Sequence, residues 1–212
     1  DLPAPGAALD LPSAPARELC DAFDGPLDPA WKLVSAKESG GRIRTYRGRL
    51  MVLGSDYRFA AAERPFGLEN ATVGVRVETR GRALQNWVGL ALMWENGSFV
   101  FAGPHLNKGQ FLAAARSGGK TATTWGGPVG LGTPEAMHQP NWVRVDLAPG
   151  TVSFWSSADG AAWRKDSEIP RTADLRGAPA ALRLGKSPTG AEAVHRPAPT
   201  PCYFDDLRVG RL

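Results

Sequence analysis

The sequence predicts an all-β sandwich built from many short strands. Apolar and polar residues alternate with a period of two along most of the chain, and no long stretch shows the 3.6-residue period of a helix. The 25 glycines and 18 prolines make up roughly a fifth of the 212 residues, more than average usage, and they lack the repeat of collagen. They mark turns between roughly eleven to thirteen short strands, a pattern typical of a sandwich or barrel.

The chain divides into a spacer and one domain. Residues 1–18 are rich in Ala and Pro and carry little charge, as in an extended linker that follows an export signal. Residues 19–212 hold the strands, and an all-β domain commonly reaches this length. No apolar run approaches the roughly 18 residues of a membrane-spanning helix. We therefore expect a secreted, periplasmic or cell-surface protein, and the Arg- and Ala-heavy composition suggests a bacterial source.

The first strands are recognised by their alternation and their turns. Residues 42–46 and 49–53 flank Arg47-Gly48, which predicts a hairpin. Residues 71–80 place three valines on one face of the next strand and charged residues on the other. Residues 87–94 are nearly all apolar, as expected for a central strand that is covered on both faces.

The later strands follow the same pattern. Asn96-Gly97 turns the apolar strand back into residues 98–101, because Asn-Gly is the strongest short hairpin signal. Two loops rich in Gly and Pro interrupt the alternation, at residues 126–140 and 187–201. The remaining strands are expected over residues 110–116, 142–147, 151–155, 181–186 and 203–209, and helix is limited to single turns such as 172–175.

The net charge of +4 does not indicate a nucleic-acid partner. Most of the 25 basic residues are Arg, and the densest cluster is Arg42, Arg44, Arg47 and Arg49. Residues spaced by two share one face of a strand. We interpret the cluster as the solvated face of a hairpin, because a nucleic-acid binder concentrates its charge in a stripe or tail.

Two cysteines, Cys20 and Cys202, lie near opposite ends of the domain. No CxxC motif and no nearby His pair accompanies them, so a zinc site is not indicated. Two interpretations are open at this point. The cysteines form a disulfide, which requires an oxidising compartment, or they are two buried thiols.

Five stretches, taken in order, resemble the concanavalin A-like lectin/glucanase superfamily. They are Asp21-Ala22-Phe23-Asp24-Gly25 with Trp31, Gly89-Leu90-Ala91-Leu92-Met93-Trp94, Asn141-Trp142-Val143-Arg144-Val145, Ser157-Ala158-Asp159-Gly160 with Trp163, and Tyr203-Phe204-Asp205-Asp206-Leu207-Arg208-Val209. The resemblance implies a jelly-roll β-sandwich of two curved antiparallel sheets. It also implies that the first strand lies beside the last, an arrangement that favours a Cys20–Cys202 bridge.

The carboxylate pattern of the superfamily's glycosidases is missing. Glycoside hydrolysis needs two carboxyl groups about 5–10 Å apart, and laminarinase-like members carry them on one strand as E-x-D-x-E or E-x-D-x-x-E. No such array occurs, and the nearest pair, Asp166-Ser167-Glu168, is expected in a turn-rich loop before Pro170. Carboxyl groups from separate strands can still meet, so a glycoside hydrolase with an unrecognised pair stays one alternative.

Exposed Trp rings and nearby polar groups make the predicted binding site. A sugar ring stacks its C–H face on an indole, while amides and carboxylates bind its hydroxyls. We interpret Trp31, Trp142 and Trp163 as core residues, and Trp94 and Trp125 as exposed platforms. The expected ligand contacts, on the concave face of a sheet, are Trp94, Glu95, Asn96, His105, Asn107, Gln110 and Trp125.

Acidic residues gather where the two ends of the domain are expected to meet, namely Asp21, Asp24, Asp205 and Asp206. Calcium prefers such oxygen ligands. Carbohydrate-binding relatives in the superfamily hold a structural calcium near the termini, which implies a site here with Asp24, Asp205 and Asp206 as ligands. The alternative is that these acids cap turns. Alternation through Leu207 and Val209 places Asp205 toward the core and Asp206 on the other face.

These observations predict a secreted, non-catalytic module that binds carbohydrate on the concave face of one sheet, with a structural calcium as its one expected cofactor. Two alternatives stay open. One is a structural or protein-interaction domain of an extracellular or envelope assembly. The other is the glycoside hydrolase described above.

Overall fold

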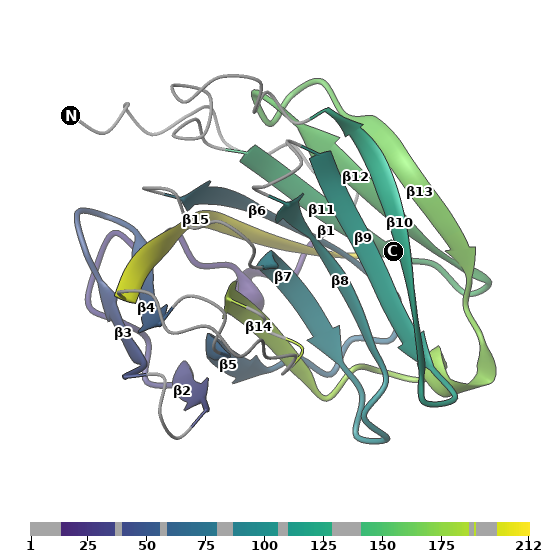
Figure 1. The fold of residues 1–212 in the computed structure, drawn as a ribbon, viewed down its shortest axis with the longest axis horizontal. Coiled ribbons are helices and arrows are strands. Elements are labelled where there is room, and N and C mark those ends of the chain that lie inside the picture. The colour runs from purple at the N-terminus through teal and green to yellow at the C-terminus, as the bar shows by residue number, and fades with distance from the viewer. Residues whose placement is uncertain are drawn as a thin grey trace.

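Two antiparallel sheets packed against each other form the protein, as the computed structural model shows (Figure 1). The structure describes residues 14–36, 40–55, 59–79, 87–105, 110–128, 141–186, 189 and 199–212. The eight-stranded sheet has the order β13 (Arg164–Pro170), β12 (Thr151–Ser157), β11 (Asn141–Leu147), β6 (Ala71–Thr79), β15 (Pro199–Arg211), β4 (Leu50–Ser55) and β3 (Arg42–Thr45), with β1 (Ala14–Pro15) paired to β15. The seven-stranded sheet has the order β10 (Lys120–Pro128), β9 (Gln110–Ser117), β8 (Phe99–His105), β7 (Val88–Met93), β14 (Ala181–Lys186), β5 (Ala60–Pro65) and β2 (Lys32–Ser35).

The core lies between the two sheets because each strand sends alternate side chains inward. Val73, Val75 and Val77 of β6 are completely buried, and they face the apolar side chains of the other sheet. Strand β7 is buried on both of its faces from Val88 to Leu92. The predicted all-β sandwich, its jelly-roll form and the central position of the apolar strand are therefore confirmed.

The predicted hairpin turns are present. The Tyr46 N–H donates to the Arg49 carbonyl at 2.8 Å, across a turn in which Arg47 and Gly48 have φ of 52° and 69°. Gly97, with φ of 80°, turns β7 into β8. Within the described ranges the helical elements are two 3-10 turns, η1 (Arg17–Leu19) and η3 (Ala173–Leu175), and none is a candidate to cross a membrane.

Five strands escape the sequence pattern: β1, β2, β5, β10 and β13. Asp166-Ser167-Glu168 lies within β13, so the loop expected there is wrong, and β10 extends through Pro128 into the loop predicted for residues 126–140. Strand β5 has the sequence AAAERP, whose Ala, Glu and Arg favour helix by intrinsic propensity. Its three alanines are nevertheless completely buried, because β5 pairs with β14 on one side and β2 on the other. Packing decides strand formation more than local preference does.

The two ends of the domain meet as the resemblance implied. The β1 strand pairs with the end of β15, and Asp21 forms an isolated bridge with Leu207. The Ala16 N–H donates to the Val209 carbonyl at 2.7 Å, and Ala16 is 1% exposed. The eight-stranded sheet therefore begins inside residues 1–18, the segment predicted as a spacer.

The predicted Cys20–Cys202 disulfide is absent, and both residues are free thiols. The sulfur of Cys20 lies 3.5 Å from the Val209 carbonyl, whereas that of Cys202 lies 3.6 Å from the Val52 carbonyl. Val209 and Cys202 are both in β15, and a strand rises about 3.3 Å per residue. Seven residues of strand thus separate the two thiols by roughly 20 Å, far beyond the roughly 7 Å between Cα atoms that a disulfide tolerates. The first strand does lie beside the last, but in a register that keeps the cysteines apart.

Candidate functional site

The outer face of the seven-stranded sheet carries an apolar patch that is separate from the main core. Strand β7 sends Leu90 and Leu92 into the core, and its intervening Ala91 belongs instead to this second patch. Trp87 and Met93 are partly buried and pack against the patch. Its buried members are Ala91, Phe99, Phe101, Leu112 and Ala114. Trp94, Glu95, Asn96, His105, Gln110 and Trp125 lie on strands of this sheet or in the turn between two of them, so its outer face is a candidate binding face.

Glycines explain why two aromatic rings stack on this face. A Cβ added to Gly103 would lie 2.8 Å from Cζ of Phe101, so the Phe101 ring occupies space that only a glycine leaves. The Trp87 ring then stacks on Phe101, with ring centroids 5.4 Å apart and an angle of 30° between the planes. Gly89 of β7 and Gly185 of β14 are directly opposite each other. A Cβ on Gly89 would lie 2.2 Å from the Ala102 carbonyl oxygen of β8, and one on Gly185 would lie 2.3 Å from the Ala60 carbonyl oxygen of β5. The Trp87 indole that packs against the buried Phe101 ring is partly exposed.

A paired cation and carboxylate lie on the same face, two and three strands away from the strand of Phe101. Glu63 of β5 and Arg183 of β14 are directly opposite in register, and Arg183 Nε donates to Glu63 Oε2 at 2.6 Å. Their side chains are 27% and 20% exposed, so both can reach a ligand. The Arg183 guanidinium also lies 5.3 Å from the centroid of the Phe59 ring. Hydroxyl groups of a ligand can therefore meet a carboxylate acceptor, guanidinium donors and aromatic rings together.

Glu63 is the one Asp or Glu in the seven described strands of this sheet. Glycoside hydrolysis requires two carboxyl groups within about 10 Å of each other. The Asp166 and Glu168 pair belongs to β13 of the other sheet, where Arg164 pairs with Asp166 and Lys165 with Glu168. The described strands of the binding face thus provide acceptor and donor groups but no carboxyl pair.

Trp94 is not an exposed platform, contrary to the prediction. It is 7% exposed and belongs to the main core, and its indole N–H donates to the Gly177 carbonyl at 3.2 Å. Trp94 follows Leu92 by two residues and therefore continues the inward phase of β7. Glu95 and Asn96 are exposed in the turn, where the Asn96 amide donates to the Asp174 carbonyl at 2.9 Å.

The other predicted contacts are placed by backbone only. His105 ends β8 directly opposite Gln110, and Trp125 of β10 is opposite Leu112, a member of the apolar patch. Asn107 and the side chains of His105, Gln110 and Trp125 lie outside the described residues. Trp87 is the ring that the sequence did not single out. Its place one residue before the apolar strand, two positions before Gly89, is the signal that could have identified it.

The predicted calcium ligands have other partners. Asp205 is directed outward, toward Arg76 Nη1 at 3.3 Å and Arg49 Nε at 3.8 Å, and Asp206 pairs with Arg208. A β-bulge between Asp205 and Arg208 shifts the alternation by one residue, so the prediction that Asp205 points toward the core is wrong. Burial raises the pKa of Asp205, although the guanidiniums of Arg76 and Arg49 lower it in part.

Asp24 is exposed near the chain start. Across the described ranges, no three His, Cys, Asp or Glu side chains come together in a group that could hold a metal ion. The calcium site of Asp24, Asp205 and Asp206 stays a prediction.

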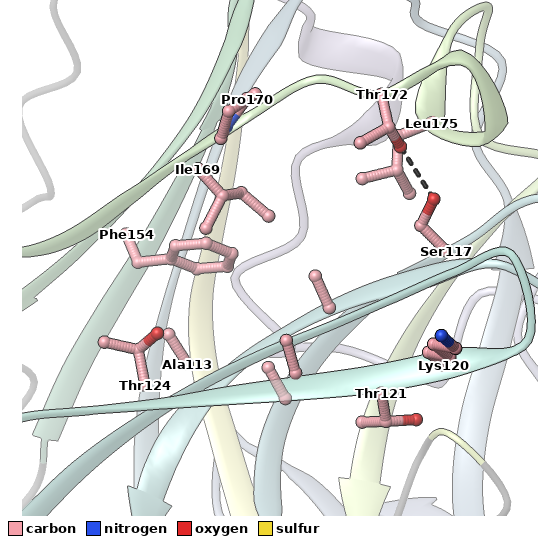
Figure 2. Close-up of a pocket in the computed structure, with 13 residues that line it drawn as sticks. Ala113, Ser117, Lys120, Thr121, Thr124, Phe154, Ile169, Pro170, Thr172 and Leu175 are labelled. Atoms are coloured by element: carbon pink, nitrogen blue, oxygen red, sulfur yellow. Dashed lines mark hydrogen bonds between the residues drawn. The ribbon is translucent and has the colours of Figure 1, made fainter.

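A hollow of about 460 Å³ opens between the sheets where β10 faces β13. Figure 2 shows Phe154 and Ile169 on one side of it and the strand that bears Ala113 on the other. The Ser117 and Thr172 hydroxyls are 2.8 Å apart at one end, and Ser117 also donates to Asp174 at 3.0 Å. Most of the lining residues are apolar, so the hollow suits an apolar group.

No family model and no curated protein match this chain. Solved structures do resemble it. The laminarinase catalytic domain of Thermotoga maritima aligns with a TM-score of 0.67 and 14% identity, over 91% of this chain and 96% of that domain. The endo-β-1,3-glucanase of Pyrococcus furiosus gives 0.65 and 13%, over 91% and 92%. The GH43 protein BlXynB of Bacillus licheniformis gives 0.67 and 14%, over 92% of this chain.

The chain spans 40% of the length of BlXynB, so it corresponds to a part of that protein. At these identities the likeness defines the fold. The protein has a jelly-roll β-sandwich fold like that of these laminarinase and endo-β-1,3-glucanase domains.

Proposed function

We propose that this domain binds carbohydrate on the outer face of the seven-stranded sheet and does not hydrolyse it. The observation that carries the proposal is the combination on one face of a stacked, partly exposed Trp87 with the Glu63–Arg183 pair. An indole offers a flat apolar surface to a sugar ring, and the ion pair offers a donor and an acceptor to its hydroxyls. The superfamily fold and neighbours that include laminarinase and xylosidase structures support a polysaccharide as the ligand.

Affinity electrophoresis of the whole chain in gels that contain laminarin or xylan tests this proposal. We expect at least one polysaccharide to retard the wild-type protein, and Trp87→Ala to abolish the retardation. Trp163→Ala is the matched control, because it removes another partly buried indole, directly before β13 of the eight-stranded sheet. Failure of every polysaccharide to retard the wild type would overturn the proposal, and so would equal losses in the two variants.

A hydrolase is the second candidate, because several structural neighbours are catalytic domains. It predicts release of reducing ends from laminarin or xylan, and loss of that release in Glu63→Gln. The binding proposal predicts no release by the wild type. It also predicts that Glu63→Gln still binds with reduced affinity, since the amide keeps an acceptor oxygen for a ligand hydroxyl.

A further inference from the structure

The β3–β4 hairpin presents three arginines that have no ion-pair partner. Arg42 and Arg44 lie on β3 and Arg47 lies in the turn, and all three side chains are exposed. In the part of the chain that the structure describes, no carboxylate lies within ion-pair distance of any of them. The neighbouring Arg49 on the same hairpin is instead buried and paired with Glu78 at 2.8 Å. The free positive charge of this sheet is therefore concentrated at its β3 edge.

The turn retains an arginine where the backbone favours another residue. Arg47 has φ of 52°, in the left-handed region, and Gly48 follows with φ of 69°. Two-residue hairpin turns of this form strongly prefer Asn or Gly at the first position, because β-carbon clashes disfavour other residues there. Backbone strain that a better residue would relieve is a reason to look for a function in the side chain.

A hollow of about 470 Å³ adjoins these arginines at the sheet edge. Arg42 and Arg44 contribute to its lining, and its apolar wall includes Leu33, Ile43 and Met51. Leu33 is 39% exposed, so part of this wall faces solvent.

An aromatic ring lies at the turn end of the arginine cluster. The guanidinium carbons of Arg44 and Arg47 lie 5.3 and 5.4 Å from the centroid of the Tyr46 ring. Tyr46 in turn lies 6.3 Å from Tyr203 of β15, ring centroid to ring centroid. Both guanidiniums thus border the same ring, which places two positive charges at the turn end of the hairpin.

We propose that this edge is a second binding site, for an acidic polysaccharide whose carboxylates pair with Arg42, Arg44 and Arg47. A guanidinium binds a carboxylate through two parallel hydrogen bonds, and residues two apart on a strand lie about 6–7 Å apart. The apolar wall beside the arginines suits the C–H face of a sugar ring. Nucleic acid is less well matched, because its affinity rises with the number of phosphates neutralised and three arginines give few. The three arginines belong to the β3–β4 hairpin of the other sheet and take no part in the proposed glycan-binding face, so the site stands independently of that proposal.

Affinity electrophoresis of the whole chain with polygalacturonate at low ionic strength tests the site. We expect retardation of the wild type, and about a tenfold loss of affinity in each of the single variants Arg42→Gln and Arg44→Gln, since a charged hydrogen bond contributes about that factor. Arg47→Asn is the third variant. It should also weaken binding, while its melting temperature stays level or rises because Asn suits the turn. Opposite changes in binding and stability would exclude unfolding as the cause.

Arg176→Gln is the control for net charge, because Arg176 is exposed after η3, away from this hairpin. Three results would overturn the proposal: no retardation of the wild type, an equal loss in Arg176→Gln, or tighter binding of single-stranded DNA at the same salt concentration. Trp87→Ala should leave polygalacturonate binding intact, which separates failure of this site from failure of the glycan-binding face.

Discussion

Replacing Trp94 by Ala is expected to destabilise the fold strongly while it leaves the proposed glycan-binding face in place. Trp94 is 7% exposed within the main core. A buried Trp removes roughly 200 Å² from water, which at about 25 cal/mol per Å² corresponds to about 5 kcal/mol. The lost indole hydrogen bond adds little, because the Gly177 carbonyl also accepts from Arg171 Nη2 at 2.7 Å. We expect a loss of about 3–5 kcal/mol, the range typical of Trp→Ala in cores.

Urea unfolding followed by far-UV circular dichroism measures this loss. With a slope of about 2.5 kcal/mol per molar urea, the midpoint of Trp94→Ala should fall by about 1.5 M. Trp94→Phe keeps most of the apolar area and should lose far less, with polysaccharide retardation unchanged. The reasoning is refuted if Trp94→Ala keeps the wild-type midpoint and loses retardation, since that result would make Trp94 an exposed sugar platform.

Three further predictions concern the turns and the thiols. Backbone N–H groups of Ala162 and Ala161 and the Ser157 hydroxyl hold the pKa of Asp159 below its ordinary value. Its stabilising contribution is therefore present above the unfolded pKa of about 4 and is lost as pH falls through the lower folded pKa, so Asp159→Ala should flatten the acid limb of melting temperature against pH. Gly160→Ala should cost about 2–3 kcal/mol in urea unfolding, because a Cβ would lie 2.8 Å from the Trp142 ring at φ of 80°. A reductant should leave the melting temperature unchanged, and thiol titration of the unfolded protein should find two free cysteines, whereas a disulfide would give neither result.

The sequence predicted the parts of the fold whose local signals agree with their packing. The valines of β6 and the Asn96-Gly97 turn are examples, because alternation and turn chemistry there lead to the same structure. Strand β5 could not be found in this way. Its alanines become strand residues only because β14 and β2 lie on either side, and pairing between distant segments leaves no local trace.

The exposure of Trp94 was predicted wrongly, and Trp87 replaces it in the proposed glycan-binding face. Trp94 stands beside a polar turn, which favoured exposure, yet the phase of β7 directs it into the core. The position of Trp87 depends on Gly103, because the missing side chain of Gly103 makes room for the Phe101 ring against which Trp87 packs. Gly103 and Trp87 are on different strands, so their relation depends on the register of β7 with β8, which the sequence does not state.

The difference between binding and hydrolysis rests on individual side chains, because one sandwich architecture accommodates both. This chain aligns with a laminarinase catalytic domain over 91% of its length. The described strands of its seven-stranded sheet nevertheless carry a single carboxylate. That carboxylate, Glu63, is hydrogen-bonded to Arg183, and no second carboxyl on those strands is available as acid or nucleophile. A face with one acceptor, one guanidinium and a stacked indole has what is needed to hold a sugar ring. To cleave a glycosidic bond it would need a further carboxyl group from outside these strands.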